Sequence, residues 1–425
     1  MVGIGGIGMS ALAQLYATLG HRVRGSDRET SPVTEILASK GIEVIVGHDA
    51  SNVADTTTLL VYSDAVPEDN PERVAAHKQG IREASYFEAL GDATKNGTSI
   101  VIAGTHGKTT TTAMLAKILI DTGKEPTVIA GSILREQGSN FVPGRPDLFV
   151  IEGCEYRRHF LQLHPSILAI TNIELDHTDY YKDLADITDA FRSIARAVPE
   201  QGTIVTDTGS PTVVPVLHDL QARIVPYQDV SIPPLRAIGE HNKMNARAAK
   251  ALAYACDPDL HETDIDKALS EFSGTWRRFE YRGTTETGAV VYDDYAHHPT
   301  AIRMTLEAVR KEFPTKRILV AFHPHLYSRT RDLMDEFAHS LAHADEVVLA
   351  PIYAAREAPI EGVTSEALAQ RIIALGTPAQ AFESLDAVLE AVRGRLNERE
   401  AAESMCITMG AGDIHKVAEE LTKSE

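Results

Sequence analysis

The sequence predicts an α/β protein of three domains, and three observations support this fold class. Short apolar runs alternate with helical stretches along most of the chain, a pattern typical of βαβ units on a parallel sheet. Two glycine-rich segments, residues 3–8 and 104–107, each lie where such a run gives way to a helix. The length of 425 residues also suits two to four domains of ordinary size.

The first domain is expected to be Rossmann-like and to span residues 1–94. A helix is predicted over about residues 10–19. The strand-like runs are residues 2–4, 21–25, 43–46 and 59–62. Residues 91–97 are mostly polar with a glycine at each end, so we interpret them as the linker to the second domain.

The second domain, residues 95–275, is predicted to be a P-loop α/β domain that ends after an Ala-rich helix reaching about residue 254. A helix is expected over residues 111–119, and strands at residues 99–103, 148–151 and 167–171. The third domain, residues 276–425, is predicted to be Rossmann-like. Its strands are expected at residues 290–292, 317–322, 346–350 and 405–409.

Composition indicates a soluble globular protein. Hydrophobic residues make up 43% of the chain and charged residues 24%, close to the average for folded domains. The net charge of −19 repels phosphate, and Lys and Arg form no basic strip, which argues against a nucleic-acid partner.

Cysteine usage and hydropathy favour a cytoplasmic protein. The 3 cysteines are far apart and lack a C-x-x-C spacing, which argues against a disulfide framework or a zinc cluster and suits a reducing compartment. No window approaches the length of an apolar membrane span. Residues 1–19 are apolar but glycine-rich and without a basic leader, which argues against a signal peptide.

The first glycine-rich segment predicts a nucleotide site. Gly3, Gly5 and Gly8 form a G-x-G-x-x-G pattern, and Asp27 ends the next predicted strand. Glycines let the backbone approach a diphosphate at a helix N-terminus, and the acid can take a ribose hydroxyl or a base edge. We expect a nucleotide or nucleotide sugar here, with a ligand-free tight turn as the alternative. A further hypothesis, that the protein is an NAD-dependent dehydrogenase, has these glycines as its only support.

The second glycine-rich segment predicts ATP binding. Gly104 and Gly107 are followed by Lys108 and Thr109, between a predicted strand and a helix. Backbone N–H groups and the helix dipole can hold phosphates, Lys108 can neutralise the terminal oxygens, and the Thr109 hydroxyl can ligate Mg²⁺. The glycine spacing is shorter than in the usual P-loop, and a structural turn is the alternative.

Metal-binding residues are predicted at the ends of two strands. Glu152 ends one strand, and Asp176 and His177 follow another. The carboxyl ends of parallel strands face one crevice, so both elements can point toward the phosphates. A carboxylate suits Mg²⁺ and an imidazole can reach a second metal, although either residue alone is more often just solvated.

Further polar clusters are less specific on physical grounds. Asn242 and Asn245 near the start of a helix could simply cap it, and Arg277 with Arg278 could be a surface pair. Two histidine clusters, at residues 297–298 and 323–325, lack the spacing of a zinc site.

Taken in order, these motifs resemble those of the Mur ligase family, ATP-dependent amide-forming enzymes of peptidoglycan precursor synthesis. The motifs that carry the resemblance are residues 104–112, 171–177, 241–245, 277–279 and 293–299, within a match that runs from about residue 3 to 413. Residues 322–333 and 353–360 look most like those of members that attach L-alanine to UDP-N-acetylmuramate. Leu326 stands where many relatives have Arg, and residues 153–158 depart from the usual acidic pattern after Glu152.

The resemblance implies a role for each matching residue. UDP-sugar contacts are implied at Gly5, Gly6, Ile7, Gly8, Met9, Ser10, Asp27, Ser63, His106 and Asn172. ATP contacts are implied at Gly104, Thr105, His106, Gly107, Lys108, Thr109, Thr110, His241, Asn242, Asn245, Arg278 and Asp294. One or two Mg²⁺ ions would be held by Thr109, Glu152 and His177, and the amino acid by Tyr295, His297 and Arg329. Lys108, Arg278, Arg329 and His297 would act in catalysis, with His297 as the base.

The expected activity is ligation of L-alanine to the lactate carboxylate of UDP-N-acetylmuramate, through an acyl phosphate, by a cytoplasmic monomer or weak homodimer with ATP and Mg²⁺ as cofactors. Two alternatives stay open. One is a murein peptide ligase that attaches L-Ala-γ-D-Glu-meso-diaminopimelate to the same nucleotide sugar. The other is a non-catalytic nucleotide-sugar sensor.

Overall fold

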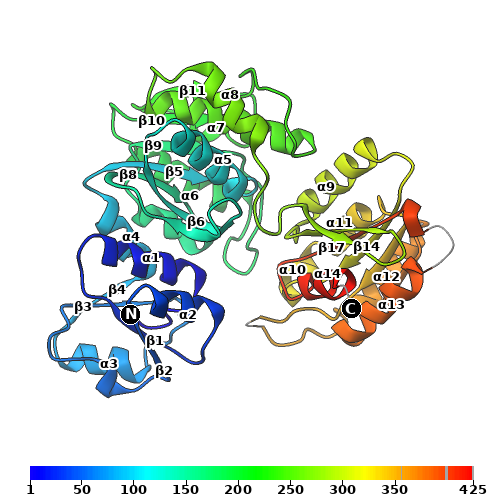
Figure 1. Cartoon of the computed structure of the whole chain (residues 1–425), viewed down its shortest axis with the longest axis horizontal. Helices are drawn as coiled ribbons and strands as arrows, with labels where there is room; N and C mark the ends of the chain where they lie inside the picture. Colours follow the sequence, from blue (N-terminus) through cyan, green and yellow to red (C-terminus); the bar gives the residue numbers. More distant parts are fainter. Residues whose placement is uncertain (356, 398–400, 424–425) are drawn as a thin grey trace. The chain divides into compact units, whose positions relative to one another are not determined.

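The computed structural model describes residues 1–355, 357–397 and 401–423 (Figure 1). Arg356, within the 353–360 motif, lies outside these residues. The chain divides into two compact units. The first comprises Met1–Glu174, Ala185–Pro234 and Met244–Ser273, and the second comprises Leu175–Leu184, Leu235–Lys243 and the chain from Gly274 onward.

The N-terminal part of the first unit alternates strands and helices as predicted. Its elements are α1 (Ile7–Thr18), β1 (Arg24–Asp27), α2 (Pro32–Ser39), β2 (Glu43–Val46), η1 (Ala50–Asn52), β3 (Leu59–Tyr62), α3 (Pro71–Lys78), β4 (Arg82–Ser85) and α4 (Tyr86–Thr94). Strands β1 and β2 pair in parallel, as do β3 and β4. The strand expected at residues 2–4 is only a bridge from Val2 to Ser26 and Tyr62, because Gly3 turns the chain away at φ +77°.

The linker predicted at residues 91–97 is wrong over its first half, because α4 continues to Thr94. Gly91 lies inside this helix, and a Cβ there would come within 2.0 Å of the Gln162 carbonyl oxygen. The glycine therefore allows close packing of α4 on the neighbouring 3-10 helix η2 (Tyr156–Gln162) and does not end the helix.

A seven-stranded sheet forms the rest of the first unit. Its strands lie in the order β11-β10-β9-β5-β8-β6-β7, and only the β6–β7 pair is antiparallel. The strands are β5 (Thr98–Ala103), β6 (Pro126–Leu134), β7 (Ser139–Val142), β8 (Arg145–Glu152), β9 (Ile167–Ile170), β10 (Thr203–Thr206) and β11 (Arg223–Pro226). The helices are α5 (Lys108–Asp121), α6 (Leu184–Ala197), η3 (Val214–Val216), α7 (Glu240–Cys256) and α8 (Glu262–Glu271), and α7 extends across the boundary of the two units.

The second unit is built on a six-stranded sheet in the order β12-β13-β17-β14-β15-β16, in which only β12 is antiparallel. The strands are β12 (Glu280–Thr284), β13 (Val290–Asp294), β14 (Arg317–Phe322), β15 (Glu346–Leu349), β16 (Ala379–Ala381) and β17 (Ser404–Met409). The helices are α9 (Pro299–Glu312), α10 (Tyr327–Asp332), α11 (Met334–Leu341), α12 (Ser365–Ala374), α13 (Leu385–Leu396), η4 (Ala401–Glu403) and α14 (His415–Thr422).

Strand β14 shows how the second sheet is buried on both faces. Ile318, Val320 and Phe322 pack in the core under α9, α11 and α12, whereas Leu319 and Ala321 face the core under α13 and α14. Side chains alternate along a strand, so a central strand between two helical layers must be apolar throughout. Among the residues that the structure describes, no helix combines the length and the apolar character needed to cross a bilayer.

Candidate active site

A cavity of about 580 Å³ lies beside the first glycine-rich segment. Its walls include Gly3, Gly5, Gly6, Asp27, His48 and Ser63. The Asp27 carboxylate accepts the Gly5 N–H at 2.7 Å, and a Cβ on Gly5 would come within 2.9 Å of Asp27 Oδ2. The acid at the end of β1 therefore fixes the loop, and the glycine leaves room for that contact.

Four other residues expected at the nucleotide sugar belong to α1 and are not among the described residues that line this cavity. Met9 and Ser10 are buried, and Ser10 Oγ donates to the Ile7 carbonyl. Gly8 instead allows close packing, because a Cβ there would come within 2.9 Å of the Tyr86 ring. The Gly6 N-cap has no side-chain capping bond, so a diphosphate could use the first N–H groups of α1.

Replacing Asp27 with Asn should raise the KM for the nucleotide sugar about tenfold, the effect of losing one charge-assisted hydrogen bond of about 1.4 kcal/mol. The KM for ATP should stay unchanged, because the predicted ATP-binding loop follows β5 of the seven-stranded sheet. Steady-state kinetics with each substrate varied in turn measures both constants. The exposed Asp55 is the control position, and equal sugar KM values for D27N and D55N would contradict the assignment.

The second glycine-rich segment forms the turn from β5 into α5. Gly104 has φ +143° and Gly107 φ +83°, conformations that favour glycine. A Cβ on Gly104 would lie 1.9 Å from Thr171 Oγ1, and one on Gly107 would lie 2.3 Å from Asn245 Oδ1. Asn245, predicted at the ATP site, therefore does lie against the predicted phosphate loop.

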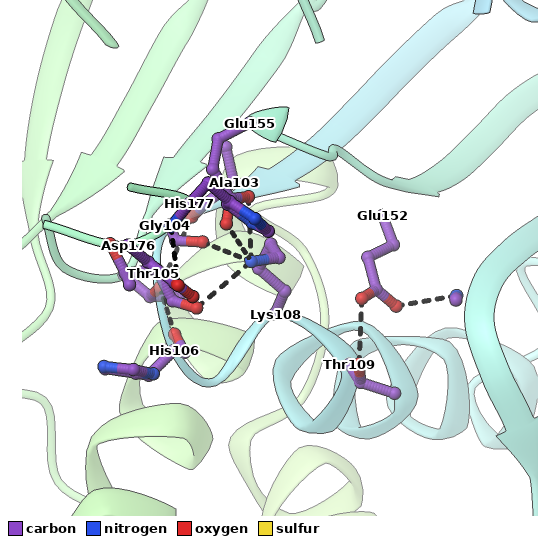
Figure 2. Close-up of polar contacts among 12 residues, drawn as sticks. Ala103, Gly104, Thr105, His106, Lys108, Thr109, Glu152, Glu155, Asp176 and His177 are labelled. Carbon is purple, nitrogen blue, oxygen red and sulfur yellow. Dashed lines mark hydrogen bonds and ion pairs between the residues drawn. The ribbon is translucent and has the colours of Figure 1, made fainter. Parts of the chain in front are cut away.

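Lys108, the first residue of α5, folds back over this loop. Figure 2 shows its Nζ between the Gly104 and Thr105 carbonyls and Glu155, whose carboxylate oxygens lie 3.0 and 2.9 Å away. Burial works against the charge on Lys108, but attraction to Glu155 outweighs it and raises the pKa of the ammonium. The lysine thus carries a permanent positive charge at the helix N-terminus, where phosphate oxygens bind.

Thr109 and Glu152 meet beside the loop, as Figure 2 also shows. Thr109 Oγ1 donates to Glu152 Oε1 at 2.8 Å, and the Gly131 N–H on β6 donates to Oε2 at 2.7 Å. Thr109 is 3% exposed. A hydroxyl and a carboxylate held this close are hard oxygen donors of the kind that Mg²⁺ prefers, so these two residues fit the predicted metal site.

The segment after β9, residues 171–174, contacts His106 of the predicted phosphate loop. The Asn172 side chain accepts the His106 N–H at 2.9 Å and donates to the His106 carbonyl at 3.0 Å. Thr171 Oγ1 donates to that same carbonyl at 2.6 Å, and the His106 ring lies 3.1 Å from the Glu174 carboxylate. Asn172 and His106, both expected at the nucleotide sugar, thus hold each other in place.

In the second unit, Asp176 and Arg329 form a buried ion pair. Arg329 Nη2 donates to Asp176 Oδ1 at 2.6 Å, and the two side chains are only 5% and 7% exposed. Burial would raise the pKa of Asp176, but the Arg329 charge, helped by the nearby His177 and His298, outweighs it and holds that pKa well below its usual range.

His297 lies in the same cluster and is a neutral imidazole. Burial and the Arg329 charge lower its pKa well below the usual value, against the opposing effect of Asp176. Its Nδ1 lies 2.8 Å from the Tyr295 carbonyl oxygen, which can only accept, so Nδ1 carries the proton and Nε2 is the basic nitrogen. The Tyr295 and His297 rings lie 5.2 Å apart, so two of the three residues predicted to bind the amino acid are neighbours.

The two adjacent arginines before β12 have different surroundings. Arg277 is 3% exposed and donates to Asp293 at 2.7 Å and to the Gly410 and Gly412 carbonyls, so it braces the sheet. The Arg278 guanidinium lies 5.1 Å from the centre of the Tyr295 ring.

Asp294 ends β13 and is 6% exposed. It accepts from Thr305 Oγ1 at 2.7 Å and from the Ala296 N–H. Burial raises the pKa of Asp294, opposed by the Thr305 bond and the Arg278 charge.

His241 and Asn242 lie in the first turn of α7. Asn242 Nδ2 donates to the Ile238 carbonyl at 2.7 Å, and the His241 ring lies so close to Gly239 that a Cβ there would be 2.6 Å from it. Both contacts are local to the start of the helix. Donation by the Asn242 amide to a carbonyl that precedes the helix is not N-capping, in which a side-chain oxygen accepts an N–H of the first turn.

His323, at the end of β14, is 5% exposed and packs against Gly412, where a Cβ would lie 2.9 Å from His323 Nδ1. Burial and the Arg277 charge lower its pKa from 6.5 to about 4, although Asp413 and the Pro351 carbonyl act in the opposite direction. The ring is therefore neutral in the folded protein at pH 7 and resists protonation.

The free energy of unfolding should consequently fall as the pH drops from about 6.5 to about 4, because the unfolded chain binds a proton that the folded chain refuses. The loss is on the order of 3 kcal/mol, since each pKa unit is worth about 1.4 kcal/mol. Urea denaturation at several pH values should show a shallower decline for His323→Gln. Parallel curves for the two proteins would contradict this.

Two residues of the site were not predicted to act in it, Gly131 and Glu155. Gly131 lies in β6, a strand that the sequence pattern did not reveal. Glu155 could have been noticed, because it follows Glu152 by one short turn in a segment that leaves the sheet edge.

Three family models match successive parts of the chain. Residues 1–98 match the model described as the Mur ligase family catalytic domain, residues 102–228 the Mur ligase middle domain, and residues 277–412 the Mur ligase glutamate ligase domain. The UDP-N-acetylmuramate–L-alanine ligase of Salinibacter ruber is 39% identical, over 99% of this chain and 93% of that protein. The enzyme of the same name from Clostridium novyi is 36% identical, over 98% of this chain and 95% of that protein.

Solved structures agree with these matches. The UDP-N-acetylmuramate–alanine ligase of Thermotoga maritima superposes with a TM-score of 0.79 at 30% identity, covering 99% of this chain and 97% of that one. A murein peptide ligase from Psychrobacter arcticus gives a TM-score of 0.71 at 24% identity, covering 100% and 99%, and shows the fold alone. The three-domain α/β fold predicted from the sequence is confirmed, and the chain belongs to the Mur ligase family.

Proposed function

We propose that this protein is an ATP-dependent ligase that joins L-alanine to the lactate carboxylate of UDP-N-acetylmuramate in peptidoglycan precursor synthesis. The observation that carries the proposal is the cluster of Lys108, Thr109 and Glu152 beside the predicted phosphate loop, in a chain similar over nearly its full length to ligases of this name. Because ATP and nucleotide sugars are cytoplasmic metabolites, we place the protein in the cytoplasm, as a monomer or weak homodimer.

The nucleotide sugar binds first in the mechanism we propose, with its diphosphate at the N-terminus of α1 and its uridine in the cavity beside Asp27. ATP binds with its phosphates at the N-terminus of α5, against the Lys108 ammonium. Thr109 and Glu152 would hold one Mg²⁺ and His177 a second, and ions bound there would neutralise charge at the γ-phosphate.

In the first step, an oxygen of the lactate carboxylate attacks the γ-phosphorus of ATP. The new O–P bond forms as the bond to the bridging oxygen breaks, which yields an acyl phosphate and ADP. Two anions must meet in this step, so the Lys108 and Arg278 cations reduce the repulsion between them.

In the second step, the amine of L-alanine attacks the acyl carbon and phosphate leaves, so that an amide bond forms. The amine must lose a proton, and His297 Nε2 is the acceptor we assign, because its ring is neutral and Nδ1 is already bonded to Tyr295. Arg329 holds the carboxylate of the amino acid, and Tyr295 lies beside it in the pocket.

Phosphate release tests this function directly. The protein is mixed with ATP, Mg²⁺ and UDP-N-acetylmuramate, and then with L-alanine, L-Ala-γ-D-Glu-meso-diaminopimelate or no acceptor. We expect release with L-alanine, together with the corresponding mass gain on the nucleotide sugar. Release with the tripeptide only would favour the murein peptide ligase, and silence from folded, ATP-binding protein would favour the non-catalytic sensor.

A further inference from the structure

The buried carboxylate of Asp176 links two parts of the second unit that the proposed mechanism uses separately. A single oxygen, Oδ1, accepts from Arg329 Nη2 and from the His177 backbone N–H, each at 2.6 Å. Arg329 comes from α10, whereas His177 lies in the loop Leu175–Leu184. In sequence, Asp176 and Arg329 are 153 positions apart.

The bond to His177 bears on the conformation of that residue. His177 has φ +54°, which is uncommon for a residue with a Cβ and needs support from its surroundings. The support comes from both sides of the residue. Asp176 holds its N–H, and its carbonyl accepts from the Tyr180 and Tyr181 N–H groups at 2.8 and 2.9 Å. Tyr181 is buried, so the turn that carries the imidazole is anchored in the unit.

The bond to Arg329 fixes the guanidinium. Arg329 is 4% exposed, and its Nη1 faces His325 Nδ1 at 3.4 Å. An arginine has five N–H donors in a rigid fork, so one bond to a fixed carboxylate sets the direction of the others. Helix α10 begins after Leu326, which has φ +69°, and residue 326 has no charged group to share this task.

We propose that Asp176 is a positioning residue that ties the metal-binding imidazole of His177 to the amino-acid-binding guanidinium of Arg329. This inference rests on the proposed function. Phosphoryl transfer to an oxygen of the lactate carboxylate and amine attack at its carbon are successive steps at one carboxyl group, and one rigid carboxylate side chain would keep the groups that serve these two steps at a fixed separation. Asp176 itself touches no substrate in this scheme.

The test compares Asp176→Ala with Asp176→Asn, which keeps an acceptor oxygen at the same place. Two quantities are measured, the KM for L-alanine and the affinity for Mn²⁺ followed by electron paramagnetic resonance with a non-hydrolysable ATP analogue present. We expect D176A to raise the alanine KM about tenfold or more and to weaken Mn²⁺ binding severalfold, as expected for losing hydrogen bonds to a charged partner. D176N keeps an acceptor oxygen for the His177 N–H and for Arg329 but loses the charge, so its losses in both quantities should be smaller than those of D176A.

Asp266→Ala is the matched control. Asp266 pairs at 2.7 Å with Lys250, which is 2% exposed, so this variant also removes a carboxylate from a buried cation. It should lower the melting temperature and leave the alanine KM and the Mn²⁺ affinity unchanged. If D176A does not fold, Arg329→Met is compared with D176A/R329M, in which no buried charge is left alone. We then expect D176A/R329M to bind Mn²⁺ more weakly than R329M does.

If the wild type is active and D176A has the wild-type alanine KM and Mn²⁺ affinity, the role of Asp176 is wrong and the proposed function is unaffected. Equal Mn²⁺ affinities of R329M and D176A/R329M would have the same meaning. Losses in D176N as large as those in D176A would also overturn it, because charge and not position would then be the cause. Wild-type protein that binds nucleotide and Mn²⁺ but ligates no amino acid would overturn the proposed function and the amino-acid half of this inference together.

Discussion

Replacing Lys108 with Ala should abolish ligation and ATP turnover together, with kcat falling by about three orders of magnitude or more, since one lost charge-stabilising donor alone costs about 10²–10³. The ammonium lies at the N-terminus of α5, bonded to the Gly104 and Thr105 carbonyls and to Glu155, and its raised pKa keeps it charged. No water molecule in its place could neutralise an oxygen of the γ-phosphate. Phosphate release under saturating substrates, with circular dichroism to confirm folding, gives the result.

Lys117 provides the control for this experiment. It lies on the same helix, is 12% exposed in its side chain and pairs at 3.0 Å with both Asp121 and Glu136. K117A thus removes a paired lysine from α5 without touching the loop, and it should turn over ATP at nearly the wild-type rate. If K108A kept normal turnover, or if K117A lost as much, the phosphate-binding role of Lys108 would be wrong.

The central sheet could be predicted from sequence only where a strand contains a long uninterrupted apolar run. Strands β5, β8 and β9 contain the continuous apolar runs 100–103, 148–151 and 167–170, as a segment covered on both faces must. Strands β10 and β11 were missed, because an Ile-Val pair is the whole apolar run of each, and β11 ends in proline. Strand β6 was missed as well, since Gly131 and Ser132 interrupt its apolar run.

The candidate site divides in a similar way. The phosphate loop could be predicted because its residues are contiguous and its glycines and lysine have a local physical reason. The Asp27 loop could be predicted for the same reason. The Asp176–Arg329 pair could not, because it joins segments distant in sequence and depends on the packing of the whole unit. The role of a glycine such as Gly91 also cannot be read from the sequence. A glycine that allows two backbones to pack closely inside a helix has the same sequence signal as one that ends the helix.

Replacing Glu152 with Gln should lower kcat by about two to three orders of magnitude, the effect of a lost charge-stabilising group in an active site. The carboxylate accepts from Thr109 Oγ1 with one oxygen and from the Gly131 N–H with the other. The glutamine amide keeps one acceptor oxygen, but its NH₂ group would face one of the two donors. The negative charge of the carboxylate is also lost. The Mg²⁺ concentration for half-maximal activity should therefore rise, while the KM for the nucleotide sugar stays constant.

Mg²⁺ titration of the ligation rate at fixed ATP measures this shift. Glu136→Gln is the control, because Glu136 is a partly exposed carboxylate whose described partners are Lys117 and Ser273, away from the phosphate loop. It should give the wild-type titration curve. A metal ligand that loses its charge must bind Mg²⁺ more weakly. A lower kcat in E152Q with an unchanged Mg²⁺ requirement would therefore mean that Glu152 acts by holding Thr109 and β6 in place.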